Sequence, residues 1–280
     1  MEEQIRNEIT RFVRVNSLNR FPESDEPYFD EPLVGYAAAN DQLFADYKTI
    51  IGDFHQTPQE VMASVIGDGV RAAGVISWIL PITKGTRESN RRENQYPSQA
   101  WAQTRFFGEQ LNSALRRHLV SWLEERGHRA VAPQLAASWK EFTDTPVGIA
   151  STWSERHAAY AAGLGTFSLN DALITPKGIA HRCGSVITDL QLRPSERPYP
   201  DHQHNCLYYR DGSCGLCIAR CPVGALSKSG HDKSRCRQYV YTTAIQALAE
   251  RFGTPQTGCG LCQTSVPCEG QIPHLRKAGQ

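Results

Sequence analysis

The chain has 280 residues, which is enough for one large domain or two ordinary ones with a substantial hydrophobic core. Hydrophobic residues make up 40% of it and charged residues 21%, a balance that excludes an intrinsically disordered protein. Lysine and arginine total 30 against 29 aspartate and glutamate residues, which argues against a broadly basic nucleic-acid-binding surface. The unevenly distributed residue is cysteine: of nine, eight lie between Cys206 and Cys268.

The N-terminal segment and the apolar runs predict a cytoplasmic protein without a membrane partner. The chain begins MEEQIRNEITRF, which lacks the apolar core of a secretory signal. The longest apolar stretch, residues 72–82, is too short to span a bilayer. In a reducing compartment, clustered cysteines indicate metal ligands or catalytic thiols rather than disulfides.

The first half of the chain predicts three helices and a buried strand. An apolar face predicts a short helix over residues 1–13. A capping box with proline at the first helical position predicts a helix from Pro58 to about Gly67. Residues 73–80 resemble a buried strand, and a leucine stripe predicts a long core-facing helix from Ser98 to about Gly127.

The second half predicts shorter elements. Residues 146–151 and 184–192 resemble strands, and a short helix is expected over 154–163. Prolines at 194, 198 and 200 then mark a domain boundary, and a last helix is expected over 234–252. We therefore expect domains at 1–195 and 196–280.

The cysteines fall into two groups. The first contains Cys206 and the run C-x2-C-x3-C-P from Cys214 to Pro222, which is the end of the bacterial ferredoxin motif for a [4Fe–4S] cluster. In two-cluster ferredoxins the cysteine before proline binds the other cluster. The second group supplies the remaining ligands, so we predict one cluster on Cys206, Cys214, Cys217 and Cys268 and another on Cys221, Cys236, Cys259 and Cys262.

The alternative is a structural zinc site, because two C-x2-C pairs can supply four thiolates to one ion. It would leave Cys206, Cys221, Cys236 and Cys268 unused. Cys183 is not among these eight ligands. It is either an ordinary buried thiol or the ligand that takes the place of the displaced Cys206. The predicted fold class is α+β, with an N-terminal α/β sandwich-like domain and a C-terminal bacterial-ferredoxin-like two-cluster domain.

A segment upstream of the cysteines resembles epoxyqueuosine reductases. It contains Ala162-Gly163-Leu164-Gly165, Asn170, Leu173-Ile174-Thr175-Pro176, Gly184-Ser185 and Thr188-Asp189-Leu190. The resemblance covers roughly residues 140–270. It implies two [4Fe–4S] clusters, a base-off cobalamin in the N-terminal domain and relatedness to reductive dehalogenases. It makes five residues candidates for cofactor binding: Gly163, Gly165, Asn170, Gly184 and Ser185.

The resemblance also implies a catalytic aspartate, which this chain lacks at the matching position. A gap-free count of thirteen residues back from Ala162 arrives at Ile149, and the nearest upstream acid is Asp144. A reduction needs a proton source, for which we take Asp144 and Tyr160 as candidates. Glu155 and His157 are further candidates, although both also suit the first turn of a helix.

The sequence thus predicts an iron–sulfur oxidoreductase that passes single electrons to a corrinoid or a small substrate. The alternative is a non-catalytic electron carrier that re-reduces a corrinoid protein. Either requires an electron donor of the ferredoxin or flavodoxin type. With a net charge of +1 and only twelve residues after Cys268, we expect tRNA to be an unlikely substrate and nucleic acid an unlikely partner.

Overall fold

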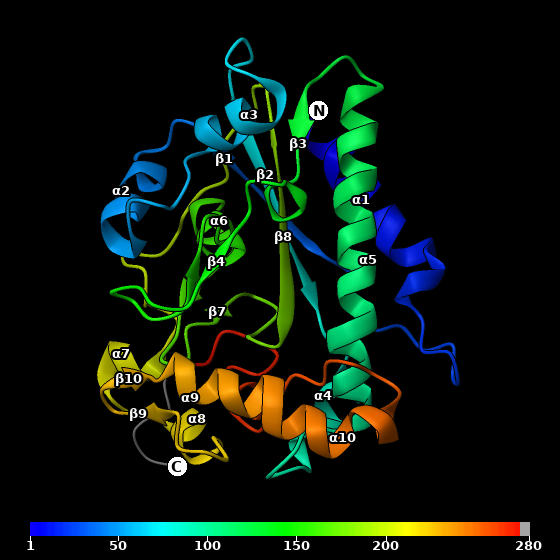
Figure 1. The fold of residues 1–280 in the computed structure, drawn as a ribbon, viewed down its shortest axis with the longest axis vertical. Coiled ribbons are helices and arrows are strands. Elements are labelled where there is room, and N and C mark those ends of the chain that lie inside the picture. The colour runs from blue at the N-terminus through cyan, green and yellow to red at the C-terminus, as the bar shows by residue number, and fades with distance from the viewer. Residues whose placement is uncertain (275–280) are drawn as a thin grey trace.

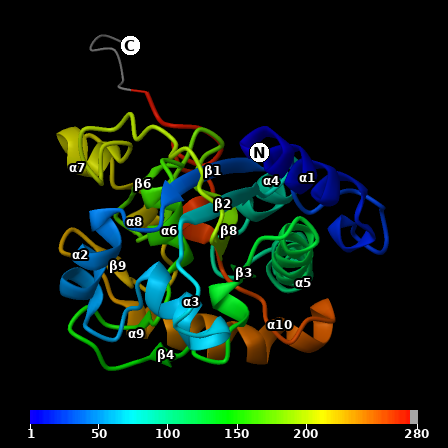
Figure 2. The ribbon, with the colours of Figure 1, turned by 90° about the horizontal axis from the view of Figure 1, so that it is seen from above.

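The computed structural model describes residues 1–274, and its centre is a four-stranded antiparallel sheet between two layers of helices (Figures 1 and 2). The strands follow the order β1 (Leu33–Ala38), β2 (Gly74–Pro81), β8 (His181–Thr188) and β3 (Ala130–Val131). One face is covered by α1 (Glu2–Val15) and α5 (Gln99–Glu124). The other is covered by α2 (Gln42–Ile51), α3 (Pro58–Ile66) and α6 (Glu155–Ala161).

Strand β2 forms the middle of the core, as the apolar run predicts. All eight of its residues are buried. Ile76 and Trp78 pack in the cluster that includes α1 and α5, whereas Val75 and Ile79 pack in the cluster with α2 and α6. A strand covered on both faces needs apolar residues at successive positions, which explains its lack of alternation.

The helix boundaries in the first half confirm the expected capping. In α3 the Thr57 side chain accepts a hydrogen bond from the backbone of Glu60, and the Glu60 side chain accepts one from the backbone of Thr57. Helix α5 begins after Ser98, whose hydroxyl accepts from the backbone of Trp101. Its leucine stripe is fully buried in the core.

The short elements of the second half differ from the expected bounds. The strand expected at 184–192 runs from His181 to Thr188, because its pairing with β2 ends where Thr188 meets Gly74. Of the strand expected at 146–151 only β5 (Ala150–Ser151) is present, paired with β4 (Glu141–Phe142). Local patterns do not determine strand ends that are set by a partner.

The cysteine-bearing part of the chain lies across one end of the sheet, at the bottom of Figure 1. Its helix expected at 234–252 is α9 (Lys233–Gln238), a π-helical segment (Tyr239–Thr243) and α10 (Ala244–Phe252). The other elements of this end are short: α4 (Lys84–Arg91), β6 (Thr166–Phe167), β7 (Leu173–Ile174), α7 (Leu207–Asp211), α8 (Leu216–Ala219), β9 (Leu226–Ser227) and β10 (Gly230–His231).

Contacts cross the expected boundary between residues 195 and 196. Leu169 and Ile179 share an apolar cluster with Cys206 and Val266, and the Ile179 amide donates to the carbonyl of Cys268 at 2.8 Å. The mixed α and β class is confirmed, while the division into two domains and the ferredoxin-like second domain stay predictions. Within residues 1–274, no helix has the length and apolar character that a membrane span requires.

Candidate functional site

The structure brings the first predicted set of four cysteines to one small apolar cavity. Cys206 precedes α7, Cys217 lies in α8, and Cys268 comes from the last loop of the described chain. Together with Cys214 they line this cavity, which we call the cysteine cavity. All are free thiols. Burial raises the pKa of Cys217 to about 11, with Cys206 and Cys214 adding to the effect.

The second predicted set of four is also gathered in space. Burial raises the pKa of Cys259 to about 12, and the nearby Cys236 and Cys221 raise it further. Burial raises the pKa of Cys262 as well, and Cys259 and Cys236 again contribute. A bound metal would supply the positive charge that stabilises buried thiolates, and thiols grouped in fours are typical of metal centres. Their roles as cluster ligands stay predictions.

In the loops around the thiols, the backbone packs closely against neighbouring side chains. Gly260 has φ +65°, and a Cβ there would lie 1.9 Å from the Trp101 indole, so only glycine fits between Cys259 and Leu261. No group of three or more His, Cys, Asp or Glu side chains within residues 1–274 converges on a single-ion site. The four thiolates of a cubane each bind a different iron and therefore stand further apart than the ligands of one ion.

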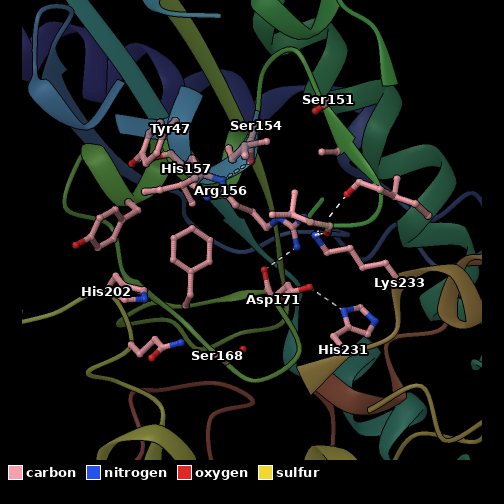
Figure 3. Close-up of a pocket in the computed structure, with 18 of the residues that line it drawn as sticks. Tyr47, Ser151, Ser154, Arg156, His157, Ser168, Asp171, His202, His231 and Lys233 are labelled. Carbon is pink, nitrogen blue, oxygen red and sulfur yellow. Dashed lines mark hydrogen bonds and ion pairs between the residues drawn. The ribbon is translucent and has the colours of Figure 1, made fainter. Parts of the chain in front are cut away.

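A larger cavity of about 620 Å³ lies next to the cysteine cavity (Figure 3). Ser168 lines both cavities, and the consecutive residues Tyr208 and Tyr209 line the cysteine cavity and the large cavity respectively. The other walls come from α2, the segment 147–160, residues 202–203 and the start of α9. The named side chains in Figure 3 include Tyr47, His157, Asp171, His202, His231 and Lys233.

The polar groups of the large cavity form two distinct environments. Burial lowers the pKa of His157 to about 3, so its ring is neutral, and its Nδ1 lies 2.8 Å from the Ser154 hydroxyl. On the other wall, His231 Nδ1 lies 3.0 Å from an Asp171 carboxylate oxygen. Burial opposes the charged form of His231, but hydrogen bonds with Asp171 and Cys236 raise its pKa to about 9.

The two predicted proton donors are placed differently. Tyr160 lines the large cavity, where burial raises the pKa of its phenol. Asp144 instead lies exposed in the turn between β4 and β5 and is not part of the cavity wall. Thr143 and Asp144 are exposed at the start of this turn, whereas Val147 and Ile149 at its end line the cavity. Ile149, at the position of the family aspartate, does line the cavity.

The three predicted glycines are required by packing. A Cβ would lie 2.2 Å from the Glu196 carbonyl at Gly163, 2.4 Å from the Ile174 carbonyl at Gly165 and 2.4 Å from the Trp78 indole at Gly184. None of the three lines the large cavity. Their role in cofactor binding therefore stays a prediction. The close contacts alone explain why glycine occupies these three positions.

Asn170 and Ser185 have polar partners. Asn170 lines the cysteine cavity, and its Nδ2 donates to the carbonyl of Cys262 at 3.0 Å, so it joins the two sets of cysteines. The Ser185 hydroxyl accepts from the Trp153 indole at 3.0 Å and donates to Glu155. Glu155 also pairs with the buried Arg116, which gives it a structural partner.

Sequence reasoning missed the charged residues of the far wall. Lys233 Nζ donates to the carbonyls of Val147 at 2.7 Å and Ile149 at 3.4 Å, and so holds the segment that bears Ile149. Asp171 and His231 are 60 positions apart and meet only in the fold. For His202 the available signal was its position four residues before Cys206.

Sequence relatives support the resemblance. An epoxyqueuosine reductase of Bacillus anthracis is 32% identical over 119 residues, which is 41% of this chain and 29% of that protein. An epoxyqueuosine reductase of Bacillus subtilis is 30% identical over 128 residues, or 44% of this chain and 31% of that protein. The matched segment thus spans about a third of the length of these relatives. No protein-family model matches the chain.

Solved structures extend the likeness to the whole fold. Epoxyqueuosine reductase with an epoxyqueuosine-modified tRNA stem loop matches 99% of this chain and 68% of its own, with a TM-score of 0.53 and 19% identity. A reductive dehalogenase whose structure suggests a mechanism for B12-dependent dehalogenation matches 86% of this chain and 30% of its own, with a TM-score of 0.53 and 15% identity.

The tRNA complex corrects one prediction. We expected nucleic acid to be an unlikely partner and tRNA an unlikely substrate, and that exclusion is wrong, since a relative of the same fold is known with a tRNA stem loop. A net charge sums over the whole chain and does not describe a local surface. The resemblance itself is confirmed: the sequence relatives of this chain are epoxyqueuosine reductases, and it shares its fold with them and with reductive dehalogenases.

Proposed function

We propose that this protein is an iron–sulfur oxidoreductase that delivers single electrons to a cofactor or substrate in the large cavity. The observation that carries the proposal is the wall shared by the two cavities at Ser168. A group bound among the four cysteines of the cysteine cavity would lie directly beside whatever occupies the large one. The names of the sequence relatives support an oxidoreductase.

The donor sets fit two [4Fe–4S] clusters. Four free thiols line the cysteine cavity, and a second set of four lies beside it, with the hydrogen bond from the Asn170 side-chain amide to the Cys262 carbonyl between them. When bound, such clusters take up and release one electron at a time. The electrons would come from a donor protein of the ferredoxin or flavodoxin type.

A corrinoid suits the large cavity in chemical character. About half of the lining residues are aliphatic or aromatic and the rest are polar or charged, a mixture that suits a large cofactor with an apolar ring and polar side groups. The fold is shared with a B12-dependent dehalogenase. When bound, a corrinoid would supply a low-potential cobalt centre; the side chains of Tyr47 and Phe167 would contact it from the cavity wall.

The residues of the cavity divide the remaining work. Tyr160 is protonated at neutral pH, and because burial raises its pKa it gives up that proton only to a strongly basic group, such as the oxygen of a substrate that is being reduced. The neutral ring of His157 forms part of the cavity wall and can make hydrogen bonds to a bound group. Lys233 positions the segment 147–149 against the cavity.

The first substrate to test is epoxyqueuosine in tRNA, the modified nucleoside carried by the stem loop of the similar structure. Removal of an epoxide oxygen as water consumes two electrons and two protons. Two one-electron transfers through the clusters and protons from Tyr160 and solvent balance that reaction. A nucleoside at the end of a flexible loop is also the kind of group that can enter a cavity of this size.

The experiment is anaerobic purification with analysis of iron, sulfide, zinc and cobalt, followed by an assay on the modified stem loop. We expect about eight iron atoms per chain, reconstitution with cobalamin, and conversion of the substrate with a chemical reductant. Tyr160→Phe should lower turnover about 100-fold without changing iron content, and Leu135→Ala, at an exposed site, should change neither. A preparation that contains zinc and no iron would contradict the proposal.

A matched pair of variants tests the ligand sets. Cys214→Ala should damage the cluster of the cysteine cavity, and Cys221→Ala should damage the other one, as seen by electron paramagnetic resonance of the reduced protein. Loss of the same signal in both variants would contradict the assignment of Cys221 to the second set.

The second candidate function is a non-catalytic carrier that re-reduces a corrinoid protein. It is favoured by Ile149, an apolar residue where the resemblance implies the catalytic aspartate, and by the exposed position of Asp144. Two intact clusters without corrinoid affinity or substrate turnover would support this function.

A further inference from the structure

A second polar cavity of about 400 Å³ lies along the free edge of β8. Strand β3 pairs only with Thr188 and Ile187, so the first half of β8 has no strand neighbour on that side. In Figure 1 this half lies between α6 and α5. Side chains take the place of the missing strand: Asn112 Nδ2 and Arg116 Nη2 donate to the carbonyl of Cys183, at 2.8 and 3.1 Å.

The lining of this cavity, which we call the arginine cavity, carries excess positive charge. Two carboxylates, Glu109 and Glu155, face four guanidinium groups. The cavity also contains His181, but burial lowers the pKa of its ring to about 4, so it is neutral. Two positive charges therefore lack a carboxylate in the lining. The four arginines are Arg105, Arg116, Arg156 and Arg182.

The two carboxylates are already engaged. Glu109 accepts from Arg116 at 2.8 Å with one oxygen and from Arg182 at 2.9 Å with the other. Burial alone would raise its pKa, yet Arg182 and Arg116 lower the pKa of Glu109 to about 2. Glu155 pairs with Arg116 at 3.1 Å. Neither carboxylate is left to neutralise a third guanidinium.

Arg105 is that third group. Within the described chain it makes no ion pair, and the hydrogen bond found for its side chain is to the Tyr241 hydroxyl at 3.4 Å. Its stem packs near Gly258, where a Cβ would lie 3.0 Å away. The charge of Arg182 and burial both lower the pKa of Arg105, because two guanidinium groups are held close together. A bound anion would relieve that repulsion.

We propose that the arginine cavity binds the oxyanion group, phosphate or carboxylate, of a small ligand, with Arg105, which has no ion pair within the described chain, as its principal donor and the adjacent Arg182 as a secondary one. A planar guanidinium offers two parallel N–H groups that match the spacing of oxyanion oxygens. Three amide side chains in the lining, Gln134, Gln256 and Gln263, can complete the hydrogen bonding. The inference does not depend on the proposed function, because it involves none of the eight predicted cluster ligands and not Tyr160; Arg156, which lines both cavities, has no role in the proposed reaction.

The test is calorimetric titration of the anaerobically purified full chain with inorganic phosphate and, separately, with succinate, at constant ionic strength. We expect saturable binding of at least one of the two at one site per chain, and the tighter of them identifies the group. Arg105→Gln should weaken that binding at least tenfold. Arg126→Gln is the matched control, since this exposed arginine lies just beyond the far end of the same helix, outside the cavity, and should leave the affinity unchanged.

Thermal unfolding without added anion separates binding from a structural role. If Arg105 has no structural ion pair and serves to bind an anion, Arg105→Gln removes its repulsion with Arg182. The unfolding temperature should then be unchanged or higher. A lower temperature together with unchanged anion affinity would overturn the proposal, and so would the absence of saturable binding by both anions in the unsubstituted protein.

Discussion

The sheet with its two helical layers and the cysteine-bearing segment after residue 205 are held together by different forces. The layers contain fully buried large side chains such as Trp78, Ile76 and Leu115. In the cysteine-bearing segment, α8 and α9 have no buried residue. The segment meets the rest of the chain through small apolar clusters: Cys206 and Val266 are its buried members in one, and Leu248 and Phe252 pack with Ala102 in another. The layers can fold on apolar burial, whereas the segment has less of it and depends more on backbone contacts and on what its thiols bind.

Removal of iron tests this comparison with the largest expected effect. Because metal binding supplies folding free energy to a segment with little core, oxidative chelation should expose residues 206–268 to protease, with cleavage at least 100-fold faster. Residues 1–190 should stay resistant. The measurement is limited proteolysis followed by mass spectrometry, and loss of both regions at the same rate would show that they form one cooperative unit.

Leu115→Ala tests the other half of the comparison, because it weakens the apolar core of the layers and leaves the cysteine-bearing segment intact. Leu115 is fully buried between α5 and the sheet, so its truncation should lower the free energy of unfolding by about 3 kcal/mol. The iron content per folded chain should not change, since the contact lies away from the thiols. Urea unfolding and iron analysis check the two halves of this prediction; Leu135→Ala, at an exposed position, is the control.

His55→Phe sharpens the comparison by a smaller, pH-dependent effect. His55 is 1% exposed, neither of its ring nitrogens has a hydrogen-bond partner within residues 1–274, and burial lowers its pKa from 6.5 to about 4. Below pH 6.5 the unfolded chain binds a proton that folded His55 does not, so the protein loses stability as pH falls toward 4. Phenylalanine removes this loss. The free energy of unfolding of the variant, relative to that of the unsubstituted protein, should be about 1.4 kcal/mol more favourable at pH 5.5 than at pH 8. Urea unfolding at the two pH values measures this. The same relative stability at both pH values would contradict the burial of a neutral His55.

Much of the fold follows from local chemistry. The capping box at Thr57, the proline at 58 and the leucine stripe of α5 depend on residues within a turn or two of each other, and the structure agrees with them. The cysteine groups likewise follow from spacing, because a cubane requires several thiolates from one tight loop. Strand ends were less predictable, since β8 ends where its partner β2 begins.

The sequence by itself determined the buried strand, the capped helices, the two cysteine groups and the family resemblance. Only the tertiary structure decided what lines the cavities. The large cavity needs α2, the segment 147–160, His202 and Lys233 to converge, and the arginine cavity exists because β3 is too short to cover β8. The physical reason is that a helix or a ligand loop is specified by near neighbours in the chain, whereas a cavity is the space left between elements whose distance is set by packing.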